Sequence, residues 1–528
     1  MFKKIEDFLK KSVPYIVPAS ILVVITLLKI LYCKIYPFLD FDEIIVVNIS
    51  KQPLNVFIRS VSSEPHSLGF YLFLRLFKNF DPSITRNIMV VISMILTILA
   101  VFFGNIFGIW KKYKLNLGMY LLLAGYAFFT TTSYIKQDTI TMPILFMSLV
   151  VYIVYKDLEK KWLLNLLLFL TVITMFFGLR PFISLMTIWF YEISLSYKNR
   201  LENQSYYRSL LSYLFIILFL FLCYLCFFGF DQIANNKYRM SWSSDTHNGL
   251  SDFFISALFP FIFAKRFKDI FIILLVVLVY DGFKKGSIFS NRVNKSIVVL
   301  FLLNILVGYL TRGYVRIRYS GFIIILLHLL ISPYLYRFRY NLFPVLFTLC
   351  FIATILFSGT EFMHLMKGDR DLLLSIESVL ENSDSSKKFV LLHGKWIIFP
   401  KVFLHNYPKL RGFVVSILPT EDDAIDFDTL QLDKTYDATY WENGGKYIFF
   451  EHLYGRFCDG YNNVLIVDTS LVGHIEEDTL EFLNKNCIYS GIEKGVGNNT
   501  FMKYKDCRCL NALNIGDYYP DSWWEEER

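Results

Sequence analysis

Acidic side chains that could act in acid–base chemistry gather just after the first long apolar segment of the chain. The stretch YPFLDFDEII, which begins at Tyr36, carries Asp40, Asp42 and Glu43 within four positions. A carboxylate within reach of a bound hydroxyl group can remove its proton, so this cluster could supply a general base. A divalent metal could also bind here, although no ligand motif supports one, and we expect no cofactor. The simpler alternative is that these carboxylates cap a helix and stay in water.

Basic side chains that could bind phosphate occur in three short loops further along the chain. TRGYVRIRY carries Arg312, Arg316 and Arg318, the turn FFGLRPF carries Arg180, and Lys136 lies in a third loop. The planar guanidinium group fits phosphate through two parallel hydrogen bonds. Each of these cations alone is better explained by pairing with lipid headgroups or with the acidic loop. For several together, a phosphate-binding pocket becomes a competing explanation.

Long apolar segments separate these polar groups. Of the 528 residues, 55% are hydrophobic and only 19% are charged, whereas soluble domains carry about 25% charged residues. A helix needs roughly 17–25 apolar residues to cross the hydrocarbon layer. The sequence therefore predicts an α-helical polytopic membrane protein with about 11 transmembrane helices, at residues 14–33, 87–110, 115–134, 139–155, 162–178, 181–197, 209–230, 269–283, 296–311, 319–336 and 341–358.

The charge of the short loops predicts the orientation of the chain, because Lys and Arg collect on the cytoplasmic side. Counted from a cytoplasmic N-terminus, every predicted inner loop is basic, including KKYK, KDLEKK and KKGSIFSNRVNK. The two large outer loops are then residues 36–86 and 230–268, and the first of them carries the acidic cluster. We expect a multi-pass protein of the plasma (inner) membrane with its C-terminal part outside the cytoplasm.

The last third of the chain predicts a separate domain. Residues 1–358 form the membrane region, whereas 359–528 contain short β-rich runs such as KKFVLLHG, KYIFFEHL and NNVLIVDTS, then a helical stretch, IEEDTLEFLNKN. We expect an extracytoplasmic α/β domain. This domain contains four cysteines: Cys458, Cys487, Cys507 and Cys509. Structural disulfides explain them better than a metal site does, and the sequence does not give the pairing of the disulfides.

The order of these motifs resembles the GT-C glycosyltransferases, in the branch that contains protein O-mannosyltransferases and aminoarabinose transferases. FDE at Phe41–Glu43 is similar to that family's acidic motif in the first outer loop. EPHSLGFYLFLRLF (64–77) resembles its HPPLYYLLLRLW-type segment, with His66 on the His but without the two prolines. SITRNIMVVIS, YIKQDTITMPILFMSLVVYIVY and VRIRYSGFIIILLHLLI resemble later segments. The resemblance covers most of the membrane region in order and spacing, and the C-terminal domain only in position and type.

The resemblance implies an inverting glycosyltransferase that moves a sugar from a polyprenyl-phosphate donor to an acceptor lipid, glycan or protein on the outer face. Asp42 is then the general base, and Glu43 either orients the acceptor or is a solvated neighbour. The partners implied are the lipid-linked donor, membrane lipids and the acceptor, and no nucleic acid. The residues implied in binding the phosphate or headgroup are His66, Lys136, Arg180, Arg316 and Arg318.

Two other functions stay open. A glycolipid transporter or flippase would place ionisable residues at mid-membrane and often shows inverted repeats. The centres of the predicted spans hold little beyond Asn304 and His328, and we detect no repeat. An O-antigen-type polymerase or ligase usually has its large loop late in the chain, which the acidic first loop and long C-terminal domain argue against. The sequence identifies neither the sugar nor the acceptor.

Overall fold

A computed structural model describes part of the chain, and every structural statement below concerns that part. Contacts divide the chain into two compact units, Met1–Pro37 with Val46–Phe362, and Phe38–Ile45 with Met363–Arg528. The described residues are 20, 23–31, 41–51, 54, 57–58, 61, 67–124, 135–198, 203–229, 291–310, 321–335, 389–393, 414–417, 462–467, 477–494 and 500–508.

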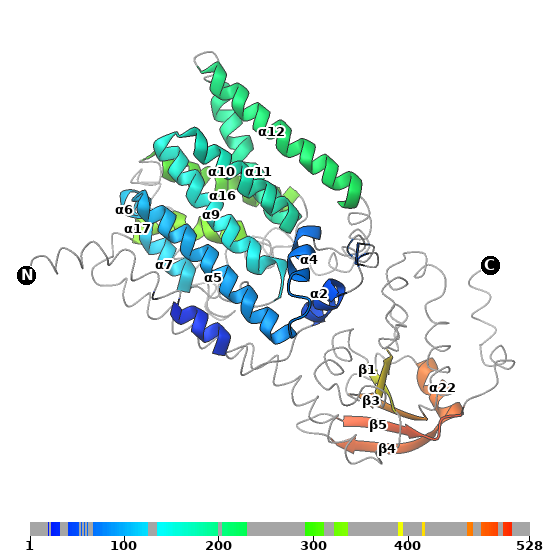
Figure 1. Ribbon diagram of the computed structural model, residues 1–528. Helices are drawn as coiled ribbons and strands as arrows, with labels where there is room; N and C mark the ends of the chain where they lie inside the picture. The colour runs from blue at the N-terminus through cyan, green and yellow to red at the C-terminus, as the bar shows by residue number, and fades with distance from the viewer. Residues whose placement is uncertain are drawn as a thin grey trace, which may run out of the picture. The chain divides into compact units, whose positions relative to one another are not determined.

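The first unit is a bundle of helices (Figure 1). Three apolar stretches are long enough to cross a membrane: Ile84–Ile106, Gln137–Leu158 and Gln204–Phe227. These are compatible with the predicted membrane protein, whereas the number of about 11 spans stays a prediction. The helices are α2 (Phe41–Lys51, which straddles the two units), α4 (Leu68–Arg75), α5 (Pro82–Ile106), α6 (Ile109–Lys112), α7 (Asn116–Ala124), α9 (Gln137–Leu158), α10 (Lys161–Phe177), α11 (Leu179–Lys198), α12 (Gln204–Tyr224), the π-helical turn η1 (Leu225–Gly229), α16 (Arg292–Leu310) and α17 (Gly321–Leu335).

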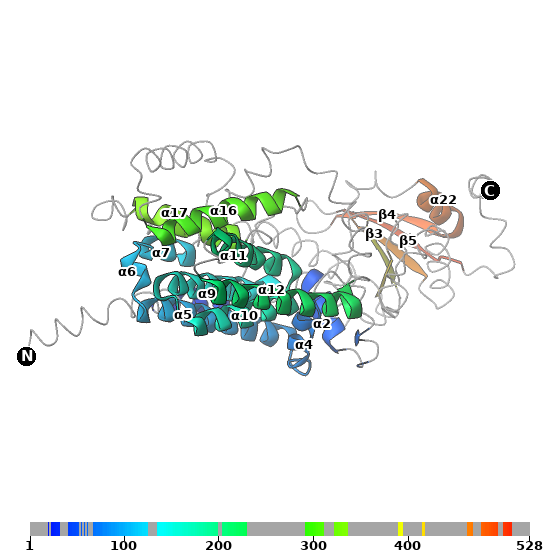
Figure 2. The same ribbon diagram turned by 90° about the horizontal axis from the view of Figure 1, so that it is seen from above.

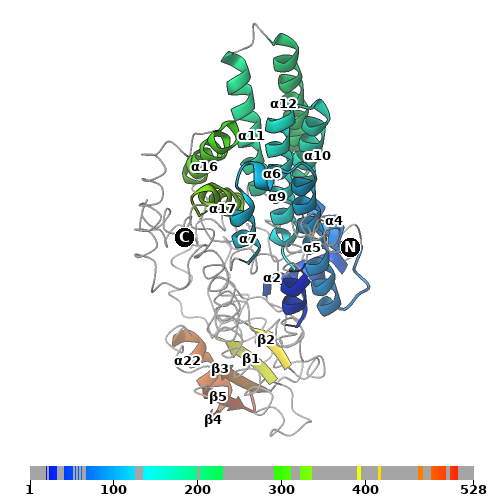
Figure 3. The same ribbon diagram turned by 90° about the vertical axis from the view of Figure 1, so that its left-hand side faces the viewer.

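Helix α9 forms the centre of this bundle. It packs against α5, α10, α11, α16 and α17, and 94% of its apolar window is buried, against 17% for α12. Helix α12 accordingly lies at the edge (Figures 1 and 3). Helices α16 and α17 lie side by side (Figure 2), and α17 also packs against α7. The exposed apolar side chains of α12, such as Phe215 and Phe219, are therefore placed as lipid-facing side chains would be.

Tight connections make neighbouring helices antiparallel. Helix α9 ends where Glu159 adopts a left-handed conformation with φ 53°, and α10 begins two residues later. Helix α10 ends at Gly178, whose N–H donates to the Thr174 carbonyl oxygen at 2.8 Å, and α11 begins at the next residue. The first turns of α9 and α11 therefore lie at one end of the bundle. Their last turns lie at the other.

The second unit contains a five-stranded sheet with the order β2-β1-β3-β5-β4. The first three strands are parallel, and the last two are antiparallel to their neighbours. Helix α22 (Glu477–Asn486) precedes β4, and a disulfide joins Cys487 to Cys507. The strands are β1 (Phe389–His393), β2 (Val414–Ile417), β3 (Asn463–Val467), β4 (Ile488–Lys494) and β5 (Thr500–Lys505).

Several predictions about this part of the chain are confirmed. KKFVLLHG contains β1, NNVLIVDTS contains β3, and IEEDTLEFLNKN contains α22. Two of the four cysteines form a structural disulfide, as expected. The other two, Cys458 and Cys509, lie outside the described residues, as does the predicted strand KYIFFEHL.

Candidate functional site

A polar pocket lies between the first turns of three helices, α9, α11 and α17. It encloses ≈ 380 Å³ of space not filled by atoms, partly open to solvent, and ≈ 20 Å³ of this can hold the centre of a water-sized sphere. One water needs about 10–15 Å³ by that measure, so the pocket holds about one water as it stands. We call this end of the bundle the pocket end. The lining residues are Gln137, Asp138, Thr141, Met142, Leu145, Arg180, Pro181, Ser184, Gly321 and Phe322.

The helical repeat explains why these residues meet. Positions 137, 138, 141, 142 and 145 of α9 share one face, since residues three and four apart are neighbours on a helix. Arg180 and Ser184 of α11 are likewise four residues apart. Pro181 between them lies in the first turn, where a missing backbone N–H costs no helical hydrogen bond.

The charged part of the lining, which we call the rim, combines a cation, a carboxylate and helix N-termini. Arg180 and Asp138 both line it, and Asp138 is 9% exposed. Lys136 is the N-cap residue of α9, and its side chain makes no capping hydrogen bond. The first N–H groups of a helix and its macrodipole favour negative charge at this position. The rim can therefore hold an anion next to hydrogen-bond donors.

The rest of the lining includes large apolar side chains, which we call the floor. Met142 and Leu145 of α9 and Phe322 of α17 line it. A Cβ atom added to Gly321 would lie 2.6 Å from the Met142 sulfur, so the methionine tip occupies the space that a larger residue would need. Methionine has three rotatable side-chain bonds, and its movement is the simplest way to widen the pocket for a larger ligand.

Two of the residues predicted from the sequence lie at the pocket end. Arg180 lines the pocket, and Lys136 directly precedes the lining residue Gln137. Arg180 lies in the first turn of α11 rather than in a turn between spans. The sequence interpretation does not include Asp138, although it stands two residues after Lys136.

The acidic cluster is described only in part. Glu43 lies in α2 and is fully buried, so the alternative that it stays in water is wrong for this residue. The backbone of Asp42 belongs to α2, but its side chain lies outside the description. Asp40, His66, Arg312, Arg316 and Arg318 also lie outside the described residues.

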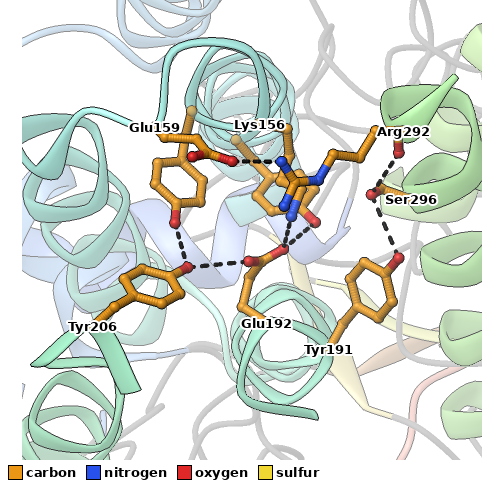
Figure 4. Close-up of polar contacts among 9 residues, drawn as sticks. Lys156, Glu159, Tyr191, Glu192, Tyr206, Arg292 and Ser296 are labelled. Carbon is orange, nitrogen blue, oxygen red and sulfur yellow. Dashed lines mark hydrogen bonds and ion pairs between the residues drawn. The ribbon is translucent and has the colours of Figure 1, made fainter. Parts of the chain in front are cut away.

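The opposite end of the bundle contains a buried ion pair that the sequence interpretation missed (Figure 4). Lys156 of α9 donates to Glu192 Oε1 of α11 at 2.8 Å, and the two side chains are 5% and 3% exposed. Tyr152 donates to the same oxygen at 2.7 Å, and Tyr206 of α12 donates to Glu192 Oε2 at 3.2 Å. Both carboxylate oxygens are therefore satisfied inside the protein.

Further contacts extend this group of residues, which we call the network end. Tyr155 hydrogen-bonds to Tyr206, and Arg292 of α16 forms an ion pair with Glu159 (Figure 4). The network thus joins α9, α11, α12 and α16. The signal in the sequence is a carboxylate inside the apolar run IWFYEISL, because a charge there needs a buried partner.

A second group of polar contacts joins α6 to α9 at the same end. Asp157 accepts hydrogen bonds from Lys112 and from the Tyr113 hydroxyl. Burial raises the pKa of Tyr113, and the hydrogen bond to Asp157 raises it further. The phenol therefore stays protonated and keeps donating at physiological pH.

A line of buried polar contacts along α11 lies between the two ends. Asn304 of α16 donates to Thr187 Oγ1 at 2.9 Å, and Ser296 donates to the Tyr191 hydroxyl at 3.5 Å. These α11 residues share a face with Arg180 and Ser184, at spacings of four, three and four residues. The predicted mid-membrane His328 bonds to the Ile324 carbonyl oxygen at 2.7 Å and is buried, as expected of a packing residue.

Two further observations bear on the site. Within the described part of the chain, no group of three or more His, Cys, Asp and Glu side chains is arranged to hold a metal ion. Comparison of the chain with protein-family models, with curated proteins and with solved structures finds no match.

Proposed function

We propose that the protein is an inverting glycosyltransferase that uses a polyprenyl-phosphate sugar as donor. The observation that carries the proposal is the meeting of Arg180 and Asp138 in one pocket at a helix end. An enzyme of this kind must hold a phosphate and a hydroxyl-rich sugar side by side, at the depth where a lipid headgroup lies. A guanidinium group binds the phosphate, and a carboxylate accepts hydrogen bonds from the hydroxyl groups of the sugar.

The distribution of charge supports an outward-facing pocket. The loops of the network end are rich in Lys and Arg, which mark the cytoplasmic side. On this assignment the pocket end faces away from the cytoplasm, in the plasma (inner) membrane, and the C-terminal sheet domain lies outside. The basic residues concerned are Lys111, Lys112, Lys114, Lys160, Lys161, Arg292 and Lys295.

Several cations bind the donor phosphate in this proposal. We assign this role to Arg180 and Lys136, helped by the N-terminal turns of α9 and α11. Arg316 and Arg318 belong to the same proposal, because the sequence resemblance implies the same role for them. His66 contacts the phosphate or headgroup.

The reaction is a direct displacement at the anomeric carbon. Asp42 removes the proton of the acceptor hydroxyl, whose oxygen then forms a bond to the anomeric carbon. The bond from that carbon to the phosphate oxygen breaks, and its electron pair leaves with the polyprenyl phosphate. The cations stabilise this negative charge as it develops. Glu43 orients the acceptor, and Asp138 accepts hydrogen bonds from the bound sugar.

Mass spectrometry of envelope glycans and glycoproteins tests the proposal, because it detects a missing glycan whichever sugar is transferred. Cells that lack the protein should lose one glycan, and Asp42→Asn should reproduce the loss at an unchanged amount of membrane protein. Asp40→Asn, which changes a neighbouring carboxylate, should restore the glycan. A complete glycan profile in the Asp42→Asn cells would show that Asp42 is not the general base.

A glycolipid transporter is the second candidate, and the polar contacts along α11 favour it. A transporter needs polar side chains inside the bundle, and the Thr187–Asn304 and Tyr191–Ser296 contacts provide them. Reconstituted vesicles separate the two functions. Movement of a polyprenyl-phosphate sugar between leaflets without formation of a glycosidic bond would support the transporter.

A further inference from the structure

One polar atom of the pocket lacks a partner inside the protein. The amide oxygen of Gln137 is buried and accepts no hydrogen bond from any described residue. A buried acceptor without a donor costs free energy, and few such atoms persist in native proteins. Because Gln137 also lines the pocket, a ligand bound there can supply the missing donor.

The chemistry of the neighbouring groups narrows the nature of that donor. The Gln137 amide oxygen and the Asp138 carboxylate both accept hydrogen bonds. Phosphate oxygens at neutral pH are also acceptors, so they cannot donate to these two groups. The Gln137 oxygen therefore matches a hydroxyl group rather than the phosphate. Met142 and Phe322 provide an apolar floor beside these acceptors. A sugar ring has this combination, with hydroxyl groups at its edge and C–H groups on its face.

We propose that Gln137 determines sugar specificity by accepting a hydrogen bond from one ring hydroxyl of the donor's sugar, while Met142 limits the depth to which the sugar enters. This inference rests on the proposed transferase function, and it assigns the pocket to the sugar rather than to the lipid. Arg180 at the rim faces the phosphate in the same arrangement. A sugar that lacks the hydroxyl leaves the amide oxygen unpaired and is rejected.

A matched control exists at the other end of the bundle. The amide oxygen of Asn116, in the first turn of α7, is also buried without a hydrogen-bond partner among the described residues, and Asn116 does not line the pocket. Gln137→Met and Asn116→Leu each replace an amide by an apolar group of similar size. If such amides are only imperfections of packing, the two variants should behave alike.

The experiment measures dissociation constants by intrinsic tryptophan fluorescence for the full chain in lipid nanodiscs. The probes are citronellyl phosphate alone, citronellyl-phosphate mannose, glucose and galactose, and their analogues in which one hydroxyl is replaced by hydrogen. Wild type and Asn116→Leu should bind one sugar about tenfold or more tightly than the analogue that lacks one particular hydroxyl. Gln137→Met should bind the two equally and citronellyl phosphate as wild type does.

The outcomes separate the two proposals. Two results would show that Gln137 does not recognise the sugar. One is that Gln137→Met still binds the deoxygenated analogue more weakly than the sugar. The other is that Gln137→Met binds citronellyl phosphate and the sugar probes more weakly than wild type by the same factor. If wild type binds citronellyl phosphate but treats every sugar probe alike, the inference fails and the proposed function stands. If wild type binds none of the probes, the proposed function fails and this inference fails with it.

Discussion

The two ends of the helical bundle use polar side chains in opposite ways. At the network end, Glu192 receives three hydrogen bonds from Tyr152, Lys156 and Tyr206, and each of its oxygens is satisfied within the protein. At the pocket end, the buried Gln137 oxygen has no described donor. The same α9 and α11 helices supply both groups. The unpartnered Gln137 oxygen lines a pocket, whereas the unpartnered Asn116 oxygen at the network end does not, so we propose that the pocket end receives a ligand and that the Glu192 contacts hold the helices together.

This comparison has a physical basis in the cost of burying charge. A buried ion pair adds stability only if hydrogen bonds satisfy its remaining lone pairs and protons, but removing one partner is strongly destabilising. Both oxygens of Glu192 accept hydrogen bonds, and these contacts tie α9, α11 and α12 to one carboxylate. A binding site has the opposite requirement, since a buried acceptor such as the Gln137 oxygen needs a donor that the described part of the protein does not supply.

The largest effect is expected when the buried ion pair loses its cation. Lys156→Met should lower the free energy of unfolding by about 3–5 kcal/mol, because Glu192 is left buried and charged without a cation. Thermal unfolding in detergent or nanodiscs measures the change. The double variant Lys156→Met/Glu192→Leu should recover most of the loss. Equal destabilisation of both variants would mean that packing of the lysine stem, rather than charge, explains the effect.

At the pocket end, removal of the guanidinium group should act on catalysis. Arg180→Ala should reduce the rate of sugar transfer about 10²- to 10³-fold, as loss of a preorganised charge-stabilising group does. The melting temperature should change little. Arg180→Lys keeps the charge without the planar fork and should recover part of the rate. A rate within twofold of wild type for Arg180→Ala would remove Arg180 from the site.

Two glycines extend the comparison to backbone packing. A Cβ atom on Gly118 would lie 2.0 Å from the His328 carbonyl oxygen, which is backbone and cannot turn aside. Gly118→Ala should cost about 1–3 kcal/mol of stability. The corresponding atom on Gly321 meets the flexible tip of Met142 at 2.6 Å, so Gly321→Ala should cost less than about 1 kcal/mol. Urea unfolding distinguishes the two, and equal losses would contradict this contrast.

The smallest effect is expected from one hydroxyl group of the network. Tyr206→Phe removes the hydrogen bond to Glu192 Oε2 and the contact with Tyr155, and should cost about 1 kcal/mol. Tyr207→Phe, at the next position, is the control, since no described contact uses its hydroxyl group. A loss as large as that of Lys156→Met would show that Glu192 depends on Tyr206 as much as on its ion-pair partner.

The long apolar segments and the two cations could be predicted from the sequence. Helices α5, α9 and α12 overlap predicted spans, although α5 and α12 each begin five residues before the predicted start and α9 begins two residues before it, because their first turns contain polar residues. Arg180 and Lys136 are identified by their place in short loops. These features depend on local composition, which a single sequence contains.

The buried ion pair, the polar edge of the sheet and the pocket depend on which segments of the chain become neighbours. Local composition does not encode those neighbours. Lys156 has the sequence context of a loop lysine, and only the packing of α11 places Glu192 beside it. The polar strand β4 lacks the apolar alternation that identifies β1 and β3, and the Cys487–Cys507 pairing is one of several that four cysteines allow. Gln137 carries no local signal, since its unpartnered oxygen is a property of the packed helices.

The most direct test makes the same chemical change at both ends of the bundle. Asp138→Asn and Glu192→Gln each replace a buried carboxylate by its amide, and each variant is measured for melting temperature and for sugar transfer per folded molecule. Asp138→Asn should lose transfer with a smaller fall in melting temperature than Glu192→Gln, whereas Glu192→Gln should keep its rate. A full rate for Asp138→Asn, or a loss of both properties in both variants, would contradict the division of the bundle into a ligand-binding end and a structural end.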